Sequence, residues 1–308
     1  MGSGGEFDRI RAILDRLGPR AAPSGDDCAI VTVGGERIAV STDLTVEGTH
    51  FRAGWLEPNE IGWRASAAAL SDLAAVAADP IGVLASVAVP REWSAERVAD
   101  LMDGVGAAAA AVGGVVLGGD LVRGERVVVD VTVIGRVRAA VGRHGGRLDD
   151  GLWVTGTLGA PRAAIRAWEM GREPTARARA RFAHPVPRIA EAAWLRDRGV
   201  SAMIDLSDGL AADAGHLAAA SAVSCVIESE RVPVDAGAEQ PEDAMVGGEE
   251  YELLAAMPVG FGDDEARRFQ AQFDLPLTRV GVLREGQGVR VLRGGQPVDV
   301  DGMFRQFE

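Results

Sequence analysis

The chain has 308 residues, of which 47% are hydrophobic and 25% are charged, and its formal net charge is −13 at pH 7. This length and composition predict a soluble globular protein with room for two hydrophobic cores. The acidic balance argues against binding to a nucleic-acid backbone, which requires a basic surface. An acidic chain can still bind a phosphorylated small molecule if metal cations stand between its carboxylates and the phosphates.

The cysteines and the chain start bear on the compartment. Cys28 and Cys225 share no C-x-x-C spacing, which is typical of reduced, buried thiols in a cytoplasmic protein. The start, MGSGGEFDRIRAIL, has no sustained apolar segment, and no stretch approaches about 18 apolar residues without charge. We therefore expect a cytoplasmic protein with no membrane partner and no nucleic-acid partner.

The first half of the chain predicts a helix, a hairpin and then alternating helices and strands. The expected helices are 6–18, 58–79 and 94–114, and the expected strands are 28–33, 37–43, 81–90, 115–120 and 126–137. The strand 37–43 should end at the acidic group Ser41, Thr42 and Asp43. The strand 115–120 should enter a glycine turn at Gly118 and Gly119.

A charged, glycine-rich stretch, RHGGRLDDG, begins at Arg143 and is the predicted domain boundary. Beyond it, strands are expected at 152–159, 201–205, 224–229 and 250–258, with helices at 160–170, 187–199 and 210–220. Strands and helices alternate in both halves, which predicts two α/β units of similar size. The expected domains are residues 1–142 and 143–308.

Five short motifs combine acidic side chains with serine, threonine or glycine: SGDD, VSTD, LSD, LGGD and IDLSD. Their acids are Asp26, Asp27, Asp43, Asp72, Asp120, Asp205 and Asp208. Carboxylate and hydroxyl oxygens are the ligands that Mg²⁺ prefers, although each motif alone is also typical of a turn or a helix N-cap. If the five motifs meet in space, their charges repel one another unless cations intervene. We therefore expect a magnesium site.

Other motifs limit the chemistry. Gly118 and Gly119 in GGDLVRG allow a ligand to approach the backbone, and Arg123 is a candidate phosphate partner. No G-x-x-x-x-G-K-[ST], HRD or DFG motif is present, which argues against P-loop and protein-kinase mechanisms. His50 is either a hydrogen-bonded loop histidine or a ligand-binding one. The segment GGEEYELL from Gly247 is either a charged strand entry or a substrate-contact loop.

Seven motifs resemble those of the thiamine-monophosphate kinase family in order and spacing: GDDCAIV, STDLTVEGTHF, LSDLAAVAADP, GGDLVRG, VTGTLG, IDLSDGL and GGEEYELL. This family belongs to the aminoimidazole ribonucleotide synthetase-like superfamily. The resemblance implies an α/β (α+β) fold, with an N-terminal mixed sheet and helices for ATP, metal and dimerisation and a C-terminal α/β domain. It also implies a homodimer built by pairing of the N-terminal sheets.

The resemblance implies that ATP phosphorylates thiamine phosphate to thiamine diphosphate, by direct in-line transfer assisted by several Mg²⁺ ions. The implied metal ligands are Asp27, Ser41, Thr42, Asp43, Asp72, Asp120, Asp205 and Asp208, of which Asp43 and Asp120 are the expected catalytic residues. The implied ATP contacts are Gly119, Asp120, Arg143 and Ser207. The implied contacts with the thiamine moiety are His50, Glu249 and Phe304.

Two alternatives stay open at this point. One is another ATP-using enzyme of the same superfamily, of the aminoimidazole ribonucleotide synthetase or selenophosphate synthetase type. A selenophosphate synthetase would need a reactive cysteine paired with lysine, and Cys28 has no nearby lysine in the sequence. The other alternative is a non-catalytic nucleotide or metal sensor, against which the presence of acids in all five motifs argues.

Overall fold

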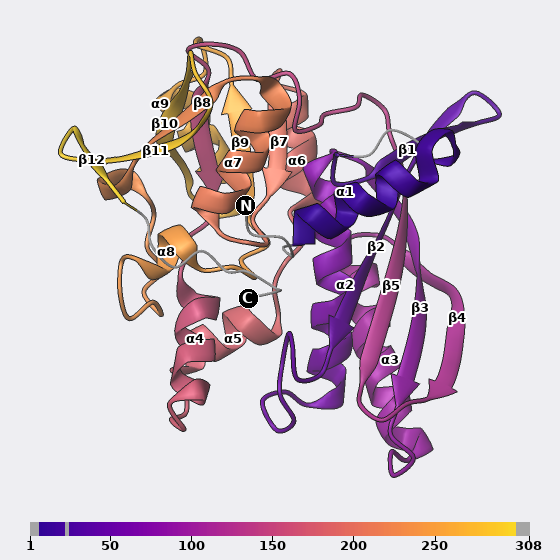
Figure 1. Cartoon of the computed structure of the whole chain (residues 1–308). Helices are drawn as coiled ribbons and strands as arrows, with labels where there is room; N and C mark the ends of the chain where they lie inside the picture. The colour runs from indigo at the N-terminus through magenta and orange to yellow at the C-terminus, as the bar shows by residue number, and fades with distance from the viewer. Residues whose placement is uncertain (1–5, 22–24, 300–308) are drawn as a thin grey trace.

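The computed structural model describes residues 6–21 and 25–299, and within them the chain forms two β-sheets with helices (Figure 1). The first sheet has five strands in the order β1-β2-β5-β3-β4, all antiparallel to their neighbours except the parallel pair β3 and β4. Its strands are β1 (Ala29–Val33), β2 (Glu36–Val46), β3 (Asp79–Val89), β4 (Val115–Arg123) and β5 (Val128–Arg136). The helices of this half are α1 (Glu6–Leu17), η1 (Gly18–Arg20), α2 (Pro58–Ala75) and α3 (Ala95–Ala111).

Helices α2 and α3 cover one face of the first sheet and leave the other face open. Val129, Val131 and Val133 of β5 are fully buried, whereas the alternating residues Asp130 and Thr132 are half-buried. Successive side chains of a strand point to opposite faces, so the valines lie under the helices and the polar residues lie on the open face. This alternation determines which acidic side chains lie on the same face of the sheet.

Close packing of α2 on α3 depends on two glycines. A Cβ atom at Gly62 would collide with the carbonyl oxygen of Leu101, and one at Gly104 would collide with the carbonyl oxygen of Asn59. Each glycine therefore lets the backbone of the other helix approach. The start of α2 is fixed by a capping box in which the Glu57 amide donates to Glu60 Oε2 at 2.9 Å.

The second sheet has seven strands in the order β12-β11-β8-β10-β6-β9-β7. Its strands are β6 (Gly151–Thr155), β7 (Ala202–Asp205), β8 (Ser224–Glu228), β9 (Leu253–Met257), β10 (Leu277–Arg284), β11 (Gly288–Arg293) and β12 (Gln296–Val298). The helices of this half are α4 (Ala160–Glu169), α5 (Ala176–Ala183), α6 (Ile189–Arg196), α7 (Leu210–Ser221), η2 (Ser229–Arg231), α8 (Asp243–Val246) and α9 (Asp263–Phe273). The strands β6, β7 and β9 have no exposed residue, as expected for the centre of a core.

Helix α2 joins the two halves, since it contacts α5, α6 and β7 as well as the first sheet (Figure 1). The hydrophobic core over the first sheet also includes Ala163 and Ala164 of α4 and Phe182 of α5. The strands of the first sheet lie before residue 142 and those of the second lie after it, and the domain division at that point stays a prediction. Among the described residues, no helix has both the length and the apolar character needed to cross a membrane.

Two expectations about strand ends were wrong. Strand β2 continues through Ser41, Thr42 and Asp43 to Val46, and β4 continues through Gly118 and Gly119 to Arg123. The reason is long-range pairing: β2 pairs with β5 up to Val46, and β4 pairs with β3 up to Arg123. Ladder hydrogen bonds from a neighbouring strand thus outweigh the local turn preference of Asp and Gly.

Candidate functional site

Three of the sequence-predicted acids converge where α2 meets the second sheet. Asp27 precedes β1, Asp72 lies in α2, and Asp205 is the last residue of β7. Each offers a carboxylate oxygen within 4.8 Å of the others, although the residues are far apart in the sequence. Asp27 and Asp205 are buried and Asp72 is half-buried, so the structure brings the three carboxylates into one shielded cluster.

The cluster has few neutralising groups. The Arg143 guanidinium donates to both oxygens of Asp27, at 2.6 and 3.1 Å, and the Ser41 hydroxyl donates to Asp72 Oδ2 at 2.6 Å. Within the described part of the chain, one arginine therefore bonds to this group of three carboxylates. Arg143, the predicted ATP contact, is held by Asp27 at the edge of this cluster.

Burial raises the pKa of all three carboxyl groups. For Asp72 the charge of Asp205 adds to the effect of burial, and for Asp205 the charge of Asp27 does so and brings its pKa to about 7. Such groups bind protons readily unless another cation offsets their repulsion. The donor set, carboxylates with a hydroxyl, fits Mg²⁺, and Asp27, Asp72, Asp205 and Ser41 are the residues that would hold it.

The Asp43 side chain points toward the same region as Asp72 and Asp205. It pairs with Val131 in the ladder between β2 and β5, so its side chain lies on the helix-covered face of the sheet. A cavity of about 200 Å³ is lined by Asp43, Asp72, Asp205, Asp208 and Ser207, together with His50, Arg64, Glu249 and Tyr251. Burial raises the pKa of Asp43, and the charge of Glu249 raises it further. We refer to this space as the acidic cavity.

Two predicted metal ligands point the other way. The Thr42 hydroxyl donates to Asp130 Oδ1 at 2.7 Å on the open face of the sheet, so Thr42 can line the acidic cavity only with its backbone. Asp120 pairs with Ser86, which pairs with Asp130, so the Asp120 side chain also lies on the open face. Within one chain, β5 and β3 separate β4 from β2, a gap of roughly 14 Å. Asp120 therefore does not join the acidic cluster of its own chain.

The loop after β7 places Ser207 and Asp208. The backbone amides of Ser207, Asp208 and Gly209 all donate to Asp213 Oδ2, at 3.1, 3.1 and 3.0 Å. Asp213 is buried in α7 and anchors this loop at the helix start. A carboxylate oxygen of Asp208 lies within 4.8 Å of one carboxylate oxygen of Asp213 and one ring nitrogen of His216. Asp208 therefore belongs to a different group of side chains from Asp27, Asp72 and Asp205.

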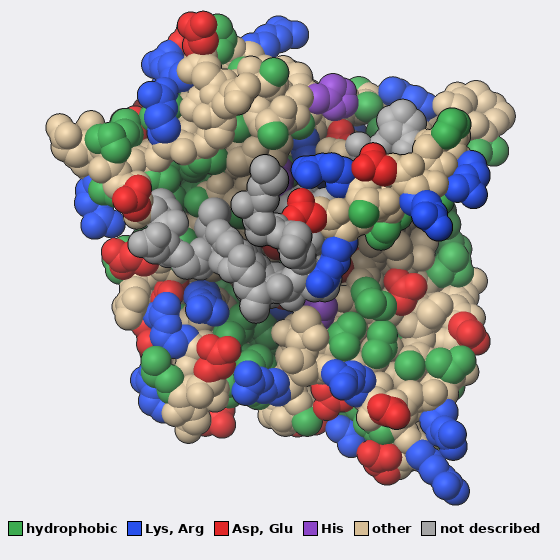
Figure 2. Space-filling model, in the orientation of Figure 1, with side chains coloured by type: hydrophobic (Ala, Val, Ile, Leu, Met, Phe, Trp, Pro, Cys, Tyr) green, Lys and Arg blue, Asp and Glu red, His purple; other side chains and the backbone are tan. Residues whose placement is uncertain are grey.

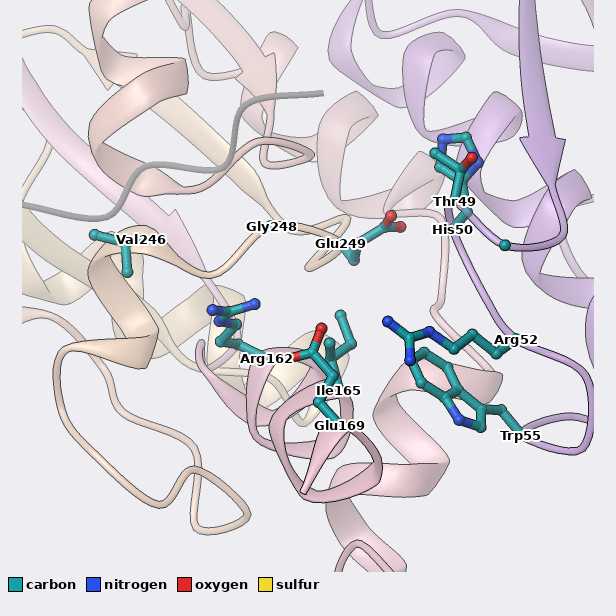
Figure 3. A pocket seen from close by; sticks show the side chains of 11 residues that line it. Thr49, His50, Arg52, Trp55, Arg162, Ile165, Glu169, Val246, Gly248 and Glu249 are labelled. Carbon is teal, nitrogen blue, oxygen red and sulfur yellow. The ribbon is translucent and has the colours of Figure 1, made fainter. Parts of the chain in front are cut away.

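A second cavity of about 240 Å³ adjoins the acidic one and contains two of the predicted substrate contacts, His50 and Glu249 (Figure 3). We call it the acceptor cavity. Its other side chains are Trp55, Arg52, Arg162, Ile165 and Glu169, with Thr49 and Val246. The Val46 amide donates to His50 Nδ1 at 3.0 Å, which leaves Nε2 of a neutral imidazole to donate to a ligand. The third predicted contact, Phe304, lies outside the described residues.

Gly119, the remaining predicted ATP contact, has a packing role that is independent of ligand. A Cβ atom at this position would collide with the carbonyl oxygen of Ala85 on the neighbouring strand β3. The glycine therefore permits normal pairing of β4 with β3. Its contact with ATP stays a prediction.

Comparison with known proteins identifies the family. The model of the AIR synthase related protein N-terminal domain matches residues 25–137, and that of the C-terminal domain matches residues 149–293. The thiamine-monophosphate kinase of Mycobacterium tuberculosis is 35% identical over 279 residues, covering 84% of this chain and 83% of the relative. That of Aquifex aeolicus is 32% identical over 311 residues, covering 97% of both. The chain belongs to the thiamine-monophosphate kinase family.

Solved structures agree with this membership. The structure described as AaThiL complexed with AMPPCP and TMP has a TM-score of 0.84 and 30% sequence identity, covering 98% of this chain and 96% of that one. The predicted two-domain fold of the thiamine-monophosphate kinase family is thereby confirmed.

Three residues of this kinase-family member carry functional geometry that the sequence did not single out. Arg64 and Tyr251 hold Glu249, and Asp213 anchors the loop of Ser207 and Asp208. Tyr251 lies inside the motif GGEEYELL, and Asp213 follows IDLSDG, so proximity to a motif was the available signal for both. Arg64 stands in the middle of a helix and had no such signal.

Proposed function

We propose that the chain transfers the γ-phosphoryl group of ATP to thiamine phosphate, giving thiamine diphosphate and ADP in thiamine biosynthesis. One observation supports the assignment most directly: the acidic cavity and the acceptor cavity adjoin and share His50 and Glu249. Two reactants bound in neighbouring cavities can meet at their boundary. The acidic cavity carries the carboxylates Asp43, Asp72, Asp205 and Asp208, which could hold the cations that the phosphate groups of both reactants would need.

The residue inventory agrees with direct transfer. The attacking atom would be a phosphate oxygen that is already anionic at neutral pH, so the reaction needs no general base. Bound Mg²⁺ ions would neutralise the approaching phosphates and align them. The chain's part is to hold these ions with Asp27, Asp72, Asp205 and Asp43, and to orient the acceptor with His50 and Glu249.

We also propose a homodimer formed through the first sheet. Among the described strands, β1 covers β2 only from Glu36 to Val40, and the outer edge of β4 pairs with none. Leu44, Leu121 and Val122, on these two strands, are 49%, 57% and 52% exposed, and Figure 2 shows apolar side chains over this sheet. Free edges with apolar residues are sites of strand pairing between chains. Pairing β2 of one copy with β4 of the other would bring the second copy's Asp120 near Thr42, beside Asp43 in the sequence.

The state of Cys28 supports the kinase over a selenophosphate synthetase. Its Sγ donates to the Asp72 carbonyl at 3.3 Å, and burial raises the pKa of the thiol. A protonated, buried thiol is a poor nucleophile. Both cysteines are buried and free of disulfides, which supports the proposal of a cytoplasmic location.

We retain residues 1–142 and 143–308 as the proposed domains.

The test is an ADP-release assay with ATP and Mg²⁺, in which thiamine phosphate and unphosphorylated thiamine compete as acceptors. We expect ADP to form only with thiamine phosphate and thiamine diphosphate to accumulate in equal amount. Turnover with thiamine alone would reassign the acceptor. ATP binding without ADP release under any acceptor would favour the sensor alternative.

A further inference from the structure

The Glu249 carboxylate is held by two side chains from different halves of the chain. The Arg64 guanidinium, on α2, and the Tyr251 hydroxyl both donate to Glu249 Oε2, the hydroxyl at 2.5 Å. Arg64 is 1% exposed and Tyr251 is 8% exposed, so neither donor can swing into solvent. Two donors on one oxygen restrict the carboxylate to one orientation.

Arg64 is itself fixed by contacts that do not involve Glu249. Its Nη1 donates to the Phe182 carbonyl at 2.5 Å, and its guanidinium carbon lies 3.8 Å from the centre of the Phe182 ring. Phe182 belongs to α5, in the other half of the chain, so both contacts fix the Arg64 side chain between the two halves. The guanidinium is therefore a rigid donor rather than a mobile surface charge.

The backbone around Glu249 is also constrained. The backbone φ angles of Glu249 and Tyr251 are +69° and +54°, which residues other than glycine rarely adopt. Their amides donate to the carbonyls of Ser207 and Leu206, both at 2.8 Å. The chain then continues into strand β9. Just before this strand, the Glu252 carboxylate accepts a hydrogen bond from Arg188. Residues held in such conformations by their surroundings cluster at functional sites.

The second oxygen of Glu249 has no side-chain partner within residues 6–21 and 25–299, and the carboxylate lines both cavities. Figure 3 shows it turned toward Thr49 and His50 across the acceptor cavity. We propose that Arg64 and Tyr251 are positioning residues, which bind Oε2 of Glu249 so that Oε1 faces the cationic thiamine moiety of the acceptor. This inference rests on the proposed function, because it takes the acceptor cavity as the site of thiamine phosphate.

The mildest test removes one hydroxyl. In Tyr251→Phe, we expect the KM for thiamine phosphate to rise about 10-fold or more, as for the loss of one hydrogen bond to a charged group. The KM for ATP should stay unchanged within about twofold. In a Glu249→Gln background, the same substitution should add no further change, because Tyr251 acts through that carboxylate. Arg64→Lys keeps the charge but loses the planar donor geometry, and should show the same split between the two KM values.

A matched control removes an equivalent hydroxyl elsewhere. The Ser201 hydroxyl donates to Asp150 Oδ2 at 2.5 Å, the same distance as in the Tyr251–Glu249 pair, and lies away from both cavities. Ser201→Ala should leave both KM values unchanged. If Tyr251→Phe raises both KM values together, or weakens thiamine phosphate equally with and without Glu249→Gln, the positioning role is wrong.

Calorimetric titration of thiamine phosphate without nucleotide gives the same double-mutant cycle independently of turnover. A wild-type protein that binds thiamine phosphate but forms no ADP would overturn the proposed function alone. The binding cycle would still decide the positioning role. Turnover on thiamine phosphate with additive effects of the two substitutions would overturn the positioning role alone, and a wild type that does not bind thiamine phosphate would overturn both.

Discussion

The side chains of Asp43 and Asp120 lie on opposite faces of one five-stranded sheet. Asp43 pairs with the buried Val131, so its side chain lies under the helices. Asp120 pairs with Ser86, which pairs with Asp130, so its side chain lies on the open face. Both residues are expected to act in catalysis, so one chain does not satisfy that expectation by itself. In the dimer proposed above, Asp120 of the second copy would instead come close to Thr42, which lines the acidic cavity.

The first prediction is complementation between two inactive variants. Asp43→Asn and Asp120→Asn should each lose at least about 100-fold in turnover, because in the proposed reaction each carboxylate would act on the transferring phosphoryl group. If Asp120 serves the partner's site, a dimer of one variant with the other has one intact site. An equal random mixture of the two chains should then regain about a quarter of wild-type turnover.

Differently tagged, co-expressed chains allow the mixed dimer to be purified and assayed. Asp103→Asn, at an exposed position on α3, is the matched control and should keep wild-type activity. An inactive mixed dimer would contradict the shared site.

The second prediction concerns stability against pH in the absence of metal. Asp205 has a folded-state pKa of about 7, above its ordinary value of 3.8, so the folded protein binds a proton more tightly than the unfolded chain does. Its contribution to stability is therefore complete below about pH 4 and is lost as the pH rises through 7. We expect Mg²⁺ at pH 8 to raise the Tm by about 5 °C or more, and EDTA to reverse the effect.

The same measurement on Asp205→Asn supplies the control. This variant should melt higher than the wild type at pH 8 without metal, because a buried charge has been removed, and should gain less from Mg²⁺. Equal Mg²⁺ stabilisation of both proteins would place the ion elsewhere.

The third prediction concerns the loop anchored by Asp213. Asp213→Asn replaces the carboxyl group that accepts from three amides with a carboxamide whose NH₂ group cannot accept, so Ser207 and Asp208 lose their fixed orientation. We expect kcat/KM for ATP to fall about 10-fold or more, with a smaller change in the KM for thiamine phosphate. Steady-state kinetics with each substrate varied in turn check this split, and an unchanged kcat/KM for ATP would contradict it.

The fourth prediction uses the chain's single tyrosine. Burial, followed by the negative charge of Glu249, holds the pKa of the Tyr251 phenol well above its usual range. In Glu249→Gln the phenol pKa should fall, since the Coulombic part is gone while the burial remains. An ultraviolet titration follows tyrosinate directly, and the chain has no lysine to titrate in the same range. An unchanged pKa in the variant would argue against the contact.

Because the folded-state pKa of Tyr251 is raised, its contribution to stability is present below about pH 10 and is lost as the pH rises above that value. Tyr251→Phe should therefore retain more of its own stability than the wild type does between neutral pH and pH 11. Equal losses in thermal melts of the two proteins would contradict this.

The acids of the site could be read from the sequence because each stands in a short local motif. Asp27, Asp72 and Asp205 were expected to meet, and their carboxylates lie within 4.8 Å of one another. The helix at Pro58 and the acid-ended strand β7 were also predictable, since capping, periodicity and composition act over a few neighbouring residues. Local chemistry was sufficient for these features.

The orientation of those acids required the folded chain. Whether Asp43 or Thr42 faces the helices depends on the register of β2 against β5, and a shift of one residue would exchange the two. Arg64 meets Glu249 across 185 positions in the sequence, so no local pattern could indicate the pair. Side-chain direction and long-range pairing arise from packing between distant segments, and these decide which residues of the motifs can act together.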